Sequence, residues 1–506
     1  MKITLVSPSP HEWTIIGYGV RILSSCLKRE GWDVNIFFFP RKIGTMYEEQ
    51  AVSELVHLAS DSDLIGISVM TDDYNAAVQL SKGFKARLNV PLIWGGIHPT
   101  IKPKQCLEHA DIVCIGEGEE ALPELVRRIK NDNDIRDIRG LWFNDNDRII
   151  KNPLRPLIQD LDSIPFQDYG LEDHYMLIDG HIQKIDEEIL LRTIGQYYLT
   201  MTTRGCPSKC TYCWNHTFNR MYPGENVLRK RSIDNVIREL VSVKDRFPFI
   251  KLFCIDDDAF FMRSLNEIKE FSEKYIEAGI NCSLWVTGAS PTSISREKVV
   301  ALVNAGMNSI RVGIEAGSER IKKMYKRPYS NQQVEKAVQI INEFRDKVKE
   351  PQYDLILDNP WESQEEQIET LSLLAKFPTP YRLFLYPLTF YPGTDLYDKA
   401  KEDGFLLGDS DEMARKSHHS FKDTYINRLF VLLFKLALKG RRITPMVMAL
   451  LTSPILMRLK ISEFLYRVLE LKYEYDQPMG KAILKGLKGM VTGEVIGSRP
   501  FLENKS

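Results

Sequence analysis

The sequence TTRGCPSKCTYCW, residues 202–214, places three thiols at C-x3-C-x2-C spacing directly after the β-rich segment 197–203. Three thiolates on one short loop suit a cubane iron–sulfur cluster, in which each iron takes one sulfur from the protein. No fourth ligand lies nearby, so one iron is left open. A structural zinc site is the alternative, but it normally closes with four ligands, and the nearest candidate to complete it is His216.

This spacing, with the aromatic Tyr212 just before the last cysteine, resembles the radical S-adenosylmethionine (SAM) superfamily. The resemblance implies that Cys206, Cys210 and Cys213 ligate a [4Fe-4S] cluster, and that Tyr212 lies at the SAM site. In that family the open iron chelates SAM, and an electron from the cluster cleaves it to methionine and a 5′-deoxyadenosyl radical. The difficult chemistry belongs to the cofactors, and the protein supplies position and excludes solvent.

The composition is typical of a protein from a reducing compartment. The chain has 506 residues, 67 basic and 68 acidic, so its net charge of −1 gives no bulk electrostatic reason to expect nucleic-acid binding. Eight cysteines, three of them at metal-ligand spacing, favour the cytosol over a disulfide framework. The N-terminal apolar run is too short for a signal peptide, and no run of about 18 uncharged apolar residues predicts a spanning helix. We expect a cytoplasmic protein.

Residues 1–135 alternate strand-like and helix-like patterns. Short apolar strands separated by amphipathic helices predict a doubly wound parallel sheet, whose ligands bind at the carboxyl ends of the strands. The predicted strands are 3–6, 34–39, 64–69, 92–94 and 112–115, and the helical stretches between them include 20–30, 48–60 and 76–88.

Residues 136–195 are predicted to be a linker with a hairpin at Gly140–Asn152, where Asn and Asp suit the tight turn. In residues 196–405 the alternation of strand and helix resumes. The six predicted strands are 197–203, 250–255, 282–286, 309–314, 353–357 and 383–387. Six strand-helix units fit the partial (β/α)6 barrel of radical SAM enzymes. Residues 406–506 turn helical, basic and apolar.

Glycine-rich segments end three strands of the first domain: Gly66–Thr71, Trp94–Thr100 and Gly116–Glu119. Glycine lets a flat ligand approach the backbone closely, although such strand ends are also simply turns. Upstream of the cysteine motif they resemble the Rossmann-like cobalamin-binding domain of the cobalamin-dependent radical SAM class, which includes anaerobic magnesium-protoporphyrin cyclase and several C-methyltransferases. The residues that this resemblance assigns to cobalamin are Ser68, Gly95, Gly96, His98, Gly116, Glu117 and Gly118.

The resemblance departs from cobalamin domains of the methionine-synthase type at the first loop. Those domains carry Asp-x-His-x-x-Gly, whose His binds cobalt. Here the loop contains His11 and Gly17 at a different spacing and lacks the Asp, so His11 is a poor cobalt ligand. The lower axial ligand is therefore left open. His98 is equally well explained as a histidine in a turn.

Two segments of the barrel resemble SAM-binding elements. Asp256, Asp257 and Asp258 follow the second strand. The resemblance implies that a pair of acidic residues lies beside the methionine moiety of SAM, and Asp257 belongs to that pair in either register. The alternative is that this segment caps the N-terminus of a helix. In Arg311–Glu319, Glu315 is expected to reach polar atoms of SAM, and Ser318 is placed at the SAM site and at the start of the next helix. The Lys326-Arg327 pair either approaches the SAM carboxylate or belongs to a solvated face.

These features predict a cobalamin-dependent radical SAM enzyme that methylates an unactivated carbon of a small-molecule or lipid-like substrate, with an electron donor such as flavodoxin or ferredoxin. One alternative keeps the same cofactors for oxidative cyclisation or ring rearrangement. Another is a non-catalytic iron–sulfur or corrinoid sensor. The basic and apolar C-terminal region either packs as a helical cap, binds a lipid-like substrate or makes a peripheral membrane contact.

Overall fold

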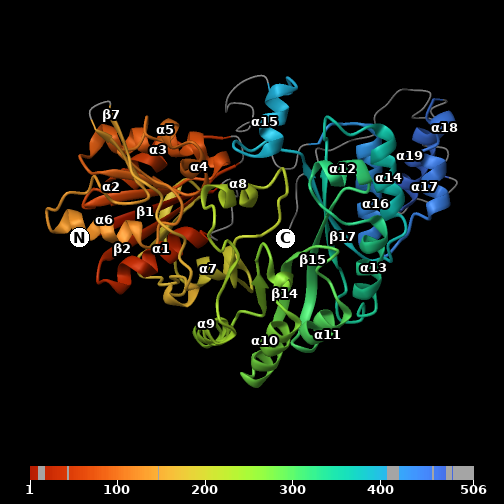
Figure 1. Ribbon diagram of the computed structural model, residues 1–506, viewed down its shortest axis with the longest axis horizontal. Coiled ribbons are helices and arrows are strands. Elements are labelled where there is room, and N and C mark those ends of the chain that lie inside the picture. The colour runs from red at the N-terminus through yellow and green to blue at the C-terminus, as the bar shows by residue number, and fades with distance from the viewer. Residues whose placement is uncertain are drawn as a thin grey trace.

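The computed structural model describes residues 1–9, 17–42, 45–145, 148–406, 421–458, 461–473 and 481. Two sheets with their own helices lie side by side, and a group of C-terminal helices covers the far side of the second sheet (Figure 1). The loop and helix that carry the predicted cluster cysteines lie between the two sheets. His11 lies outside the described residues.

The first sheet has nine strands in the order β7-β6-β5-β4-β3-β1-β2-β8-β9. The strands predicted from the sequence are β1 to β5, which pair in parallel and confirm the doubly wound sheet. The bounds are β1 (Lys2–Ser9), β2 (Asp33–Pro40), β3 (Leu64–Ser68), β4 (Leu92–Gly95), β5 (Ile112–Cys114), β6 (Leu141–Asp145), β7 (Arg148–Lys151), β8 (His174–Ile178) and β9 (His181–Lys184).

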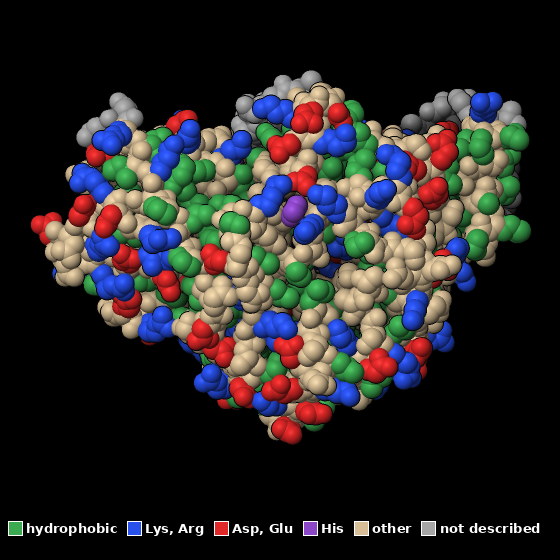
Figure 2. All heavy atoms as spheres, in the orientation of Figure 1, with side chains coloured by type: hydrophobic (Ala, Val, Ile, Leu, Met, Phe, Trp, Pro, Cys, Tyr) green, Lys and Arg blue, Asp and Glu red, His purple; other side chains and the backbone are tan. Residues whose placement is uncertain are grey.

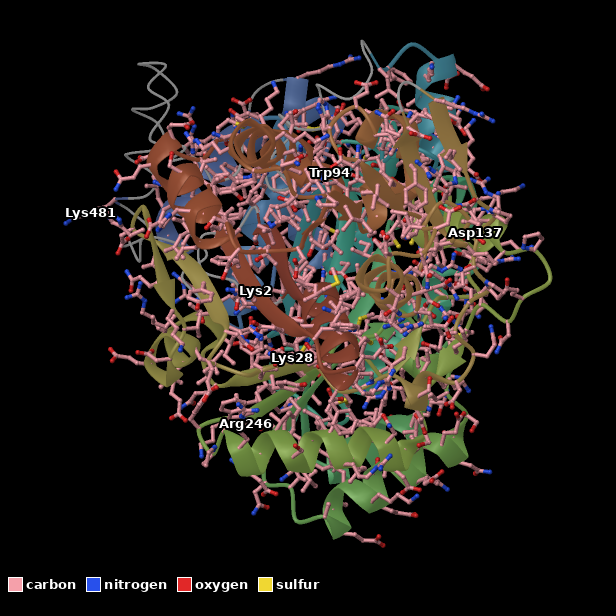
Figure 3. The ribbon with its side chains drawn as sticks, turned by 90° about the vertical axis from the view of Figure 1, so that its left-hand side faces the viewer. Lys2, Lys28, Trp94, Asp137, Arg246 and Lys481 are labelled. Carbon is pink, nitrogen blue, oxygen red and sulfur yellow. The ribbon has the colours of Figure 1, made fainter. Side chains whose placement is uncertain are left out.

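Alternate side chains of the first sheet enter two different cores. Leu5 of β1 packs with the helices α1 and α6 on one face, whereas Val6 packs with α2 and α3 on the other. Figure 3 shows the labelled Trp94 at the end of β4 among these helices. The helices are α1 (Tyr18–Arg29), α2 (Glu49–Leu58), α3 (Tyr74–Arg87), α4 (Ile97–Ile101), α5 (Pro103–Cys106) and α6 (Ala121–Lys130), with the 3-10 turn η1 (Thr71–Asp73).

The segment predicted as a linker extends the first sheet at both edges. The hairpin predicted at Gly140–Asn152 is β6 and β7, which joins the edge at β5 in antiparallel pairing. A second hairpin, β8 and β9, was not predicted; β8 pairs in parallel with β2 at the opposite edge. The 3-10 turn η2 (Leu161–Ser163) lies in the chain between the two hairpins, and α7 (Glu187–Ile194) follows β9 and precedes the second sheet.

The second sheet has six parallel strands in the order β10-β13-β14-β15-β16-β17. Its first and last strands are edges, so the barrel is partial, as predicted. The strands are β10 (Tyr197–Thr200), β13 (Leu252–Ile255), β14 (Ser283–Ala289), β15 (Met307–Glu315), β16 (Gln352–Leu357) and β17 (Arg382–Pro387). A small antiparallel pair, β11 (Thr203–Arg204) and β12 (Arg229–Lys230), flanks the cysteine loop.

The barrel helices begin at strong N-caps. Ser264, Ser330 and Ser363 each form a capping box with the Glu or Gln three residues later, which satisfies two backbone N–H groups at each helix start. The helices are α8 (Trp214–Met221), α9 (Ile233–Arg246), α10 (Leu265–Glu277), α11 (Arg296–Asn304), α12 (Glu319–Met324), α13 (Asn331–Asn342), α14 (Gln364–Leu374) and α15 (Asp395–Glu402), with the 3-10 turn η3 (Phe260–Met262).

The described C-terminal residues are helical, as predicted: α16 (Tyr425–Leu438), α17 (Pro445–Leu451), α18 (Pro454–Arg458) and α19 (Ile461–Tyr473). Helix α16 packs as a cap, because Leu429, Phe430 and Leu433 are at most 3 % exposed in the core that they share with the barrel. None of the described helices is both long and apolar enough to span a membrane.

Candidate functional site

A cavity of about 230 Å³ opens at the carboxyl ends of β3, β4 and β5, between α1 and α6. Six of the seven residues assigned to cobalamin line it: Ser68, Gly95, Gly96, Gly116, Glu117 and Gly118. Its walls are otherwise largely apolar and include Leu5, Leu23 and Cys114. The volume lies below the range of about 300–1,000 Å³ that encloses a drug-sized ligand, so a larger cofactor would insert only a part of itself here.

Two glycines of this cavity are also required by the backbone. Gly96 has φ +107°, and a Cβ there would lie 2.9 Å from the carbonyl oxygen of Val69. Gly116 has φ +86°, and a Cβ would lie 2.2 Å from the hydroxyl of Tyr222, which follows α8. The loop after β5 is thus packed directly under the C-terminal end of the helix that carries the cluster motif.

His98 stands apart from the cavity lining. Its side chain is buried, 2 % exposed, and packs against the ring of Tyr74 at 4.9 Å between centroids. Burial lowers the pKa of His98 to about 4, so the imidazole is neutral. The structure places His98 within the short helix α4, and its assignment to cobalamin stays a prediction.

The cluster loop is tied to its surroundings by backbone contacts. The Thr211 hydroxyl donates to the carbonyl of Met324 at 2.9 Å, and the Thr211 amide donates to the carbonyl of Tyr325 at 3.2 Å. Cys213 is the N-cap of α8, and the Asn219 side chain donates to the carbonyl of Cys206 at 2.8 Å. Both ends of the loop are therefore held by contacts with other parts of the chain.

The donor set of this loop fits a cluster better than a single ion. Within the described part of the chain, the sulfurs of Cys206, Cys210 and Cys213 do not all lie within 4.8 Å of one another. Thiolates around one tetrahedral zinc, with Zn–S bonds of about 2.3 Å, would be about 3.8 Å apart. Cys206 and Cys213 are partly accessible, and burial raises the pKa of the Cys213 thiol to about 12 when no metal is bound.

The three aspartates after β13 have different positions. Asp257 is 2 % exposed; its carboxylate accepts hydrogen bonds from the Thr202 amide at 2.5 Å and the Thr203 amide at 3.1 Å, and also from the Thr202 hydroxyl. Burial raises the pKa of Asp257 to about 6. Asp256 and Asp258 are solvent-accessible, and Asp258 lies close to Cys213. The structure thus places Asp257 under the cluster loop and leaves its neighbours accessible.

Glu315 ends β15 in a strained conformation with φ +64°, after a register shift in the pairing with β16. Burial raises the pKa of Glu315 to about 7, while the Arg327 guanidinium at 3.5 Å and a hydrogen bond with Tyr212 oppose that shift. The Tyr212 ring packs edge-on against Tyr325 at 5.1 Å. The predicted SAM residues Glu315 and Tyr212 therefore meet beside Cys210.

Ser318 caps α12 rather than facing an open site. Its side chain is 2 % exposed, accepts from the Ile321 amide at 3.4 Å and donates to Glu366 at 3.0 Å. The prediction that Ser318 opens the next helix is confirmed. Its assignment to SAM stays a prediction, and any contact would have to come from its backbone.

Three arginines near the predicted sites make contacts that were not predicted from the sequence. Arg204 lines the first-domain cavity and donates to Glu117 at 3.1 Å and to Glu119 at 2.5 Å. Arg229 also donates to Glu117 at 2.7 Å. Since Arg204 stands two residues before Cys206, its position within the motif was a signal that sequence reasoning left unused. The third is Arg327, for which the sequence left open a position at the SAM carboxylate or on a solvated face, and which contacts Cys210.

Comparisons with known proteins follow the same division of the chain. Residues 13–126 match the B12 binding domain family, and residues 200–371 match the Radical SAM superfamily. The chain is 29 % identical over 427 residues to an uncharacterized methyltransferase of Pyrococcus horikoshii, covering 80 % of this chain and 84 % of the relative.

A second relative is the anaerobic magnesium-protoporphyrin IX monomethyl ester cyclase of Cereibacter sphaeroides, 26 % identical over 73 % of this chain. The chain spans 59 % of the length of that cyclase. Among solved structures, the radical SAM methyltransferase TsrM of Kitasatospora setae, with cobalamin and a [4Fe-4S] cluster bound, shares the fold. The TM-score is 0.63 at 17 % identity, covering 80 % of this chain and 78 % of that one.

The positions of the aspartates predict different effects of two substitutions. Asp257→Ala leaves the Thr202 and Thr203 amides without their acceptor, at a cost of about 1–3 kcal/mol for each buried group. We expect this variant to take up far less iron and sulfide on reconstitution. Asp258→Ala should keep the cluster and bind SAM roughly tenfold more weakly, as expected for loss of about 1.4 kcal/mol.

Iron and sulfide analysis measures the first effect, and equilibrium dialysis with SAM measures the second. If Asp257→Ala instead retained its cluster and lost SAM binding, Asp257 would be a ligand of SAM and its position under the loop would not explain its role.

Proposed function

Because the chain belongs to the cobalamin-dependent radical SAM enzymes, we propose that it methylates an unactivated carbon of a small-molecule or lipid-like substrate. The observation that carries the proposal is the position of Arg204. Its guanidinium contributes to the wall of the B12-domain cavity, and its backbone leads directly into the cluster loop. Methyl transfer to a substrate activated at the cluster requires the two cofactors to face one carbon, because proximity supplies much of the rate.

The chain's own residues hold and orient the cofactors. Cys206, Cys210 and Cys213 would ligate the cluster; Tyr212 and Glu315 would contact SAM; the glycines at the ends of β4 and β5 would admit the corrinoid. When bound, the cluster supplies the electron that cleaves SAM, and cobalamin carries the methyl group. The protein contributes the fixed geometry of the loop and a largely apolar wall that excludes water.

The cyclase relative keeps a second enzymatic function open. Oxidative cyclisation or ring rearrangement would use the same residues, but its product would lose hydrogens and would gain no carbon. A non-catalytic sensor would not cleave SAM. The accessible carboxylate of Asp258 close to Cys213, and Glu315 beside Cys210, support an enzyme that binds SAM.

The first experiment is anaerobic reconstitution with iron and sulfide, followed by SAM, hydroxocobalamin, a reductant and candidate substrates. For each methyl group added we expect one 5′-deoxyadenosine, one methionine and one S-adenosylhomocysteine, with two electrons taken from the reductant. Mass spectrometry of the substrate should show the gain of CH2. A Cys210→Ala variant, which removes one cluster ligand, should form none of these products.

A product that is lighter by hydrogens, formed without S-adenosylhomocysteine, would show that the enzyme catalyses cyclisation and not methylation. No 5′-deoxyadenosine from a protein with a fully formed cluster would exclude both enzymatic functions and favour the sensor.

We also propose that the electron donor is a small acidic protein of the flavodoxin or ferredoxin kind, which docks over α8. Lys and Arg side chains gather around a histidine in the middle of the face shown in Figure 2. Lys209 lies in the cluster loop, and Arg220 and Lys326, 47 % and 50 % exposed, share one carboxylate, that of Asp395. Such an excess of cations steers an acidic partner and is screened by salt.

Reversal of one charge tests this docking surface. Arg220→Glu should lower the rate of SAM cleavage driven by a flavodoxin about tenfold relative to the rate driven by dithionite, most strongly at low salt. Arg246→Glu is the matched control, because Arg246 (labelled in Figure 3) ends α9, which Figure 1 shows apart from α8. Equal ratios for both variants would place the donor elsewhere.

A peripheral lipid contact is proposed for the C-terminal helices. Met446, Leu450 and Ile455 are 80 %, 48 % and 69 % exposed, and the basic segment 439–442 precedes them in the chain. Replacing Met446 and Ile455 by Ser should reduce co-sedimentation with vesicles of anionic phospholipid at least several-fold. Ile276→Ser, which changes a residue 54 % exposed on α10, should have no effect. Wild-type protein that does not bind the vesicles would refute the contact.

A further inference from the structure

The Arg327 side chain makes a direct contact with a predicted cluster ligand. Its Nη1 donates to the Cys210 sulfur at 3.6 Å, while Nη2 donates to the carbonyl oxygen of Gly313 at 2.7 Å. Nε donates to the Tyr329 hydroxyl at 3.3 Å. The guanidinium, 14 % exposed, is thus fixed at three nitrogens, with one N–H group directed at the sulfur.

The turn after α12 delivers Arg327 to this position. Lys326 has φ +53°; its amide donates to the carbonyl of Lys323 at 3.0 Å, and the Arg327 amide donates to the carbonyl of Lys322 at 2.9 Å. These two bonds form a Schellman motif with Lys in the place that glycine usually takes. Lys326 therefore points outward to Asp395 at 3.0 Å, and Arg327 turns inward. Of the Lys326-Arg327 pair, which the sequence allowed as a solvated face, only Lys326 faces solvent.

The strand beside Arg327 leaves room for the guanidinium. A Cβ added to Gly313 would lie 2.7 Å from Arg327 Nη2 and 2.6 Å from Glu315 Oε1. Any side chain at this position would have to displace one of these groups. The close packing at Gly313 is a second observation that ties Arg327 to the sulfur of Cys210.

We propose that Arg327 sets the reduction potential of the cluster by its charge and its hydrogen bond to the Cys210 sulfur. Hydrogen bonds to cluster sulfurs and nearby charge tune these potentials, and a donor with positive charge stabilises the reduced, more negative form. Arg327 is in this role a positioning residue with no contact to the reacting carbon. The inference rests on the proposed function in one respect, that Cys210 ligates a cluster.

The test is a redox titration of the reconstituted full-length chain, followed by electron paramagnetic resonance of the reduced cluster, without SAM or substrate. Arg327→Met should lower the equilibrium constant for one-electron reduction about tenfold, which equals 59 mV. Lys326→Met removes the same charge from the adjacent residue, which has no bond to sulfur, and should leave the potential unchanged.

Three further variants separate an effect through the sulfur from a general disturbance. Arg327→Lys keeps the charge but cannot bind Gly313 and the sulfur together, so we expect a smaller fall. Gly313→Ala retains both charged side chains but crowds them, so the potential should fall if Arg327 is displaced and rise if Glu315 is displaced. Glu315→Gln removes a neighbouring carboxylate and should raise the potential, in the opposite sense to Arg327→Met.

Each outcome decides one question. If the wild-type chain forms no [4Fe-4S] cluster, the proposed function fails and the inference falls with it. If the cluster forms and Arg327→Met has the wild-type potential, the inference alone is wrong. Equal falls in Arg327→Met and Glu315→Gln would show that their ion pair maintains the local fold, and would also overturn the role of the sulfur contact.

Discussion

The structure depends on a buried ion network that joins its two cofactor-binding parts. Arg204 binds Glu117 and Glu119, and Arg229 binds Glu117 a second time; the two carboxylates are 12 % and 11 % exposed. Loss of one partner from such a network typically costs about 3–5 kcal/mol, because a charge is left buried and unpaired. The network therefore fixes the loop after β5, which lines the first-domain cavity, against the cluster loop.

Much of the fold was predictable because its signals are local. Short apolar strands and amphipathic helices define both sheets, and the three cysteines lie within eight residues of one another. The individual roles of polar residues were less predictable. Which of three consecutive aspartates turns inward depends on backbone amides 54 and 55 residues earlier in the chain, and no property of the triplet itself reveals that choice.

Long-range packing also explains what the sequence left hidden. His98 follows a glycine-rich turn, as a ligand would, but contact with Tyr74 buries it. Arg327 belongs to a charged pair that is typical of a solvated face, and only the left-handed conformation of Lys326 sends the second side chain inward. The hairpin of β8 and β9 follows a proline-rich segment that resembles a linker, and its pairing with β2 is set by contacts far along the chain.

The strand order of the first sheet has a consequence for the order of assembly. Residues 1–126, which include the match to the B12 binding domain family at residues 13–126, leave β2 at an edge of the sheet. That edge is covered only when β8 has been synthesised, because β8 pairs in parallel with β2 and places Met176 beside Phe38. During translation, β2 of the corrinoid-binding domain is thus an open, apolar edge strand until the chain has grown past residue 184. Formation of the two sheets is therefore coupled during synthesis as well as in the folded protein, because β8 and β9, which complete the first sheet, come shortly before the second sheet in the chain.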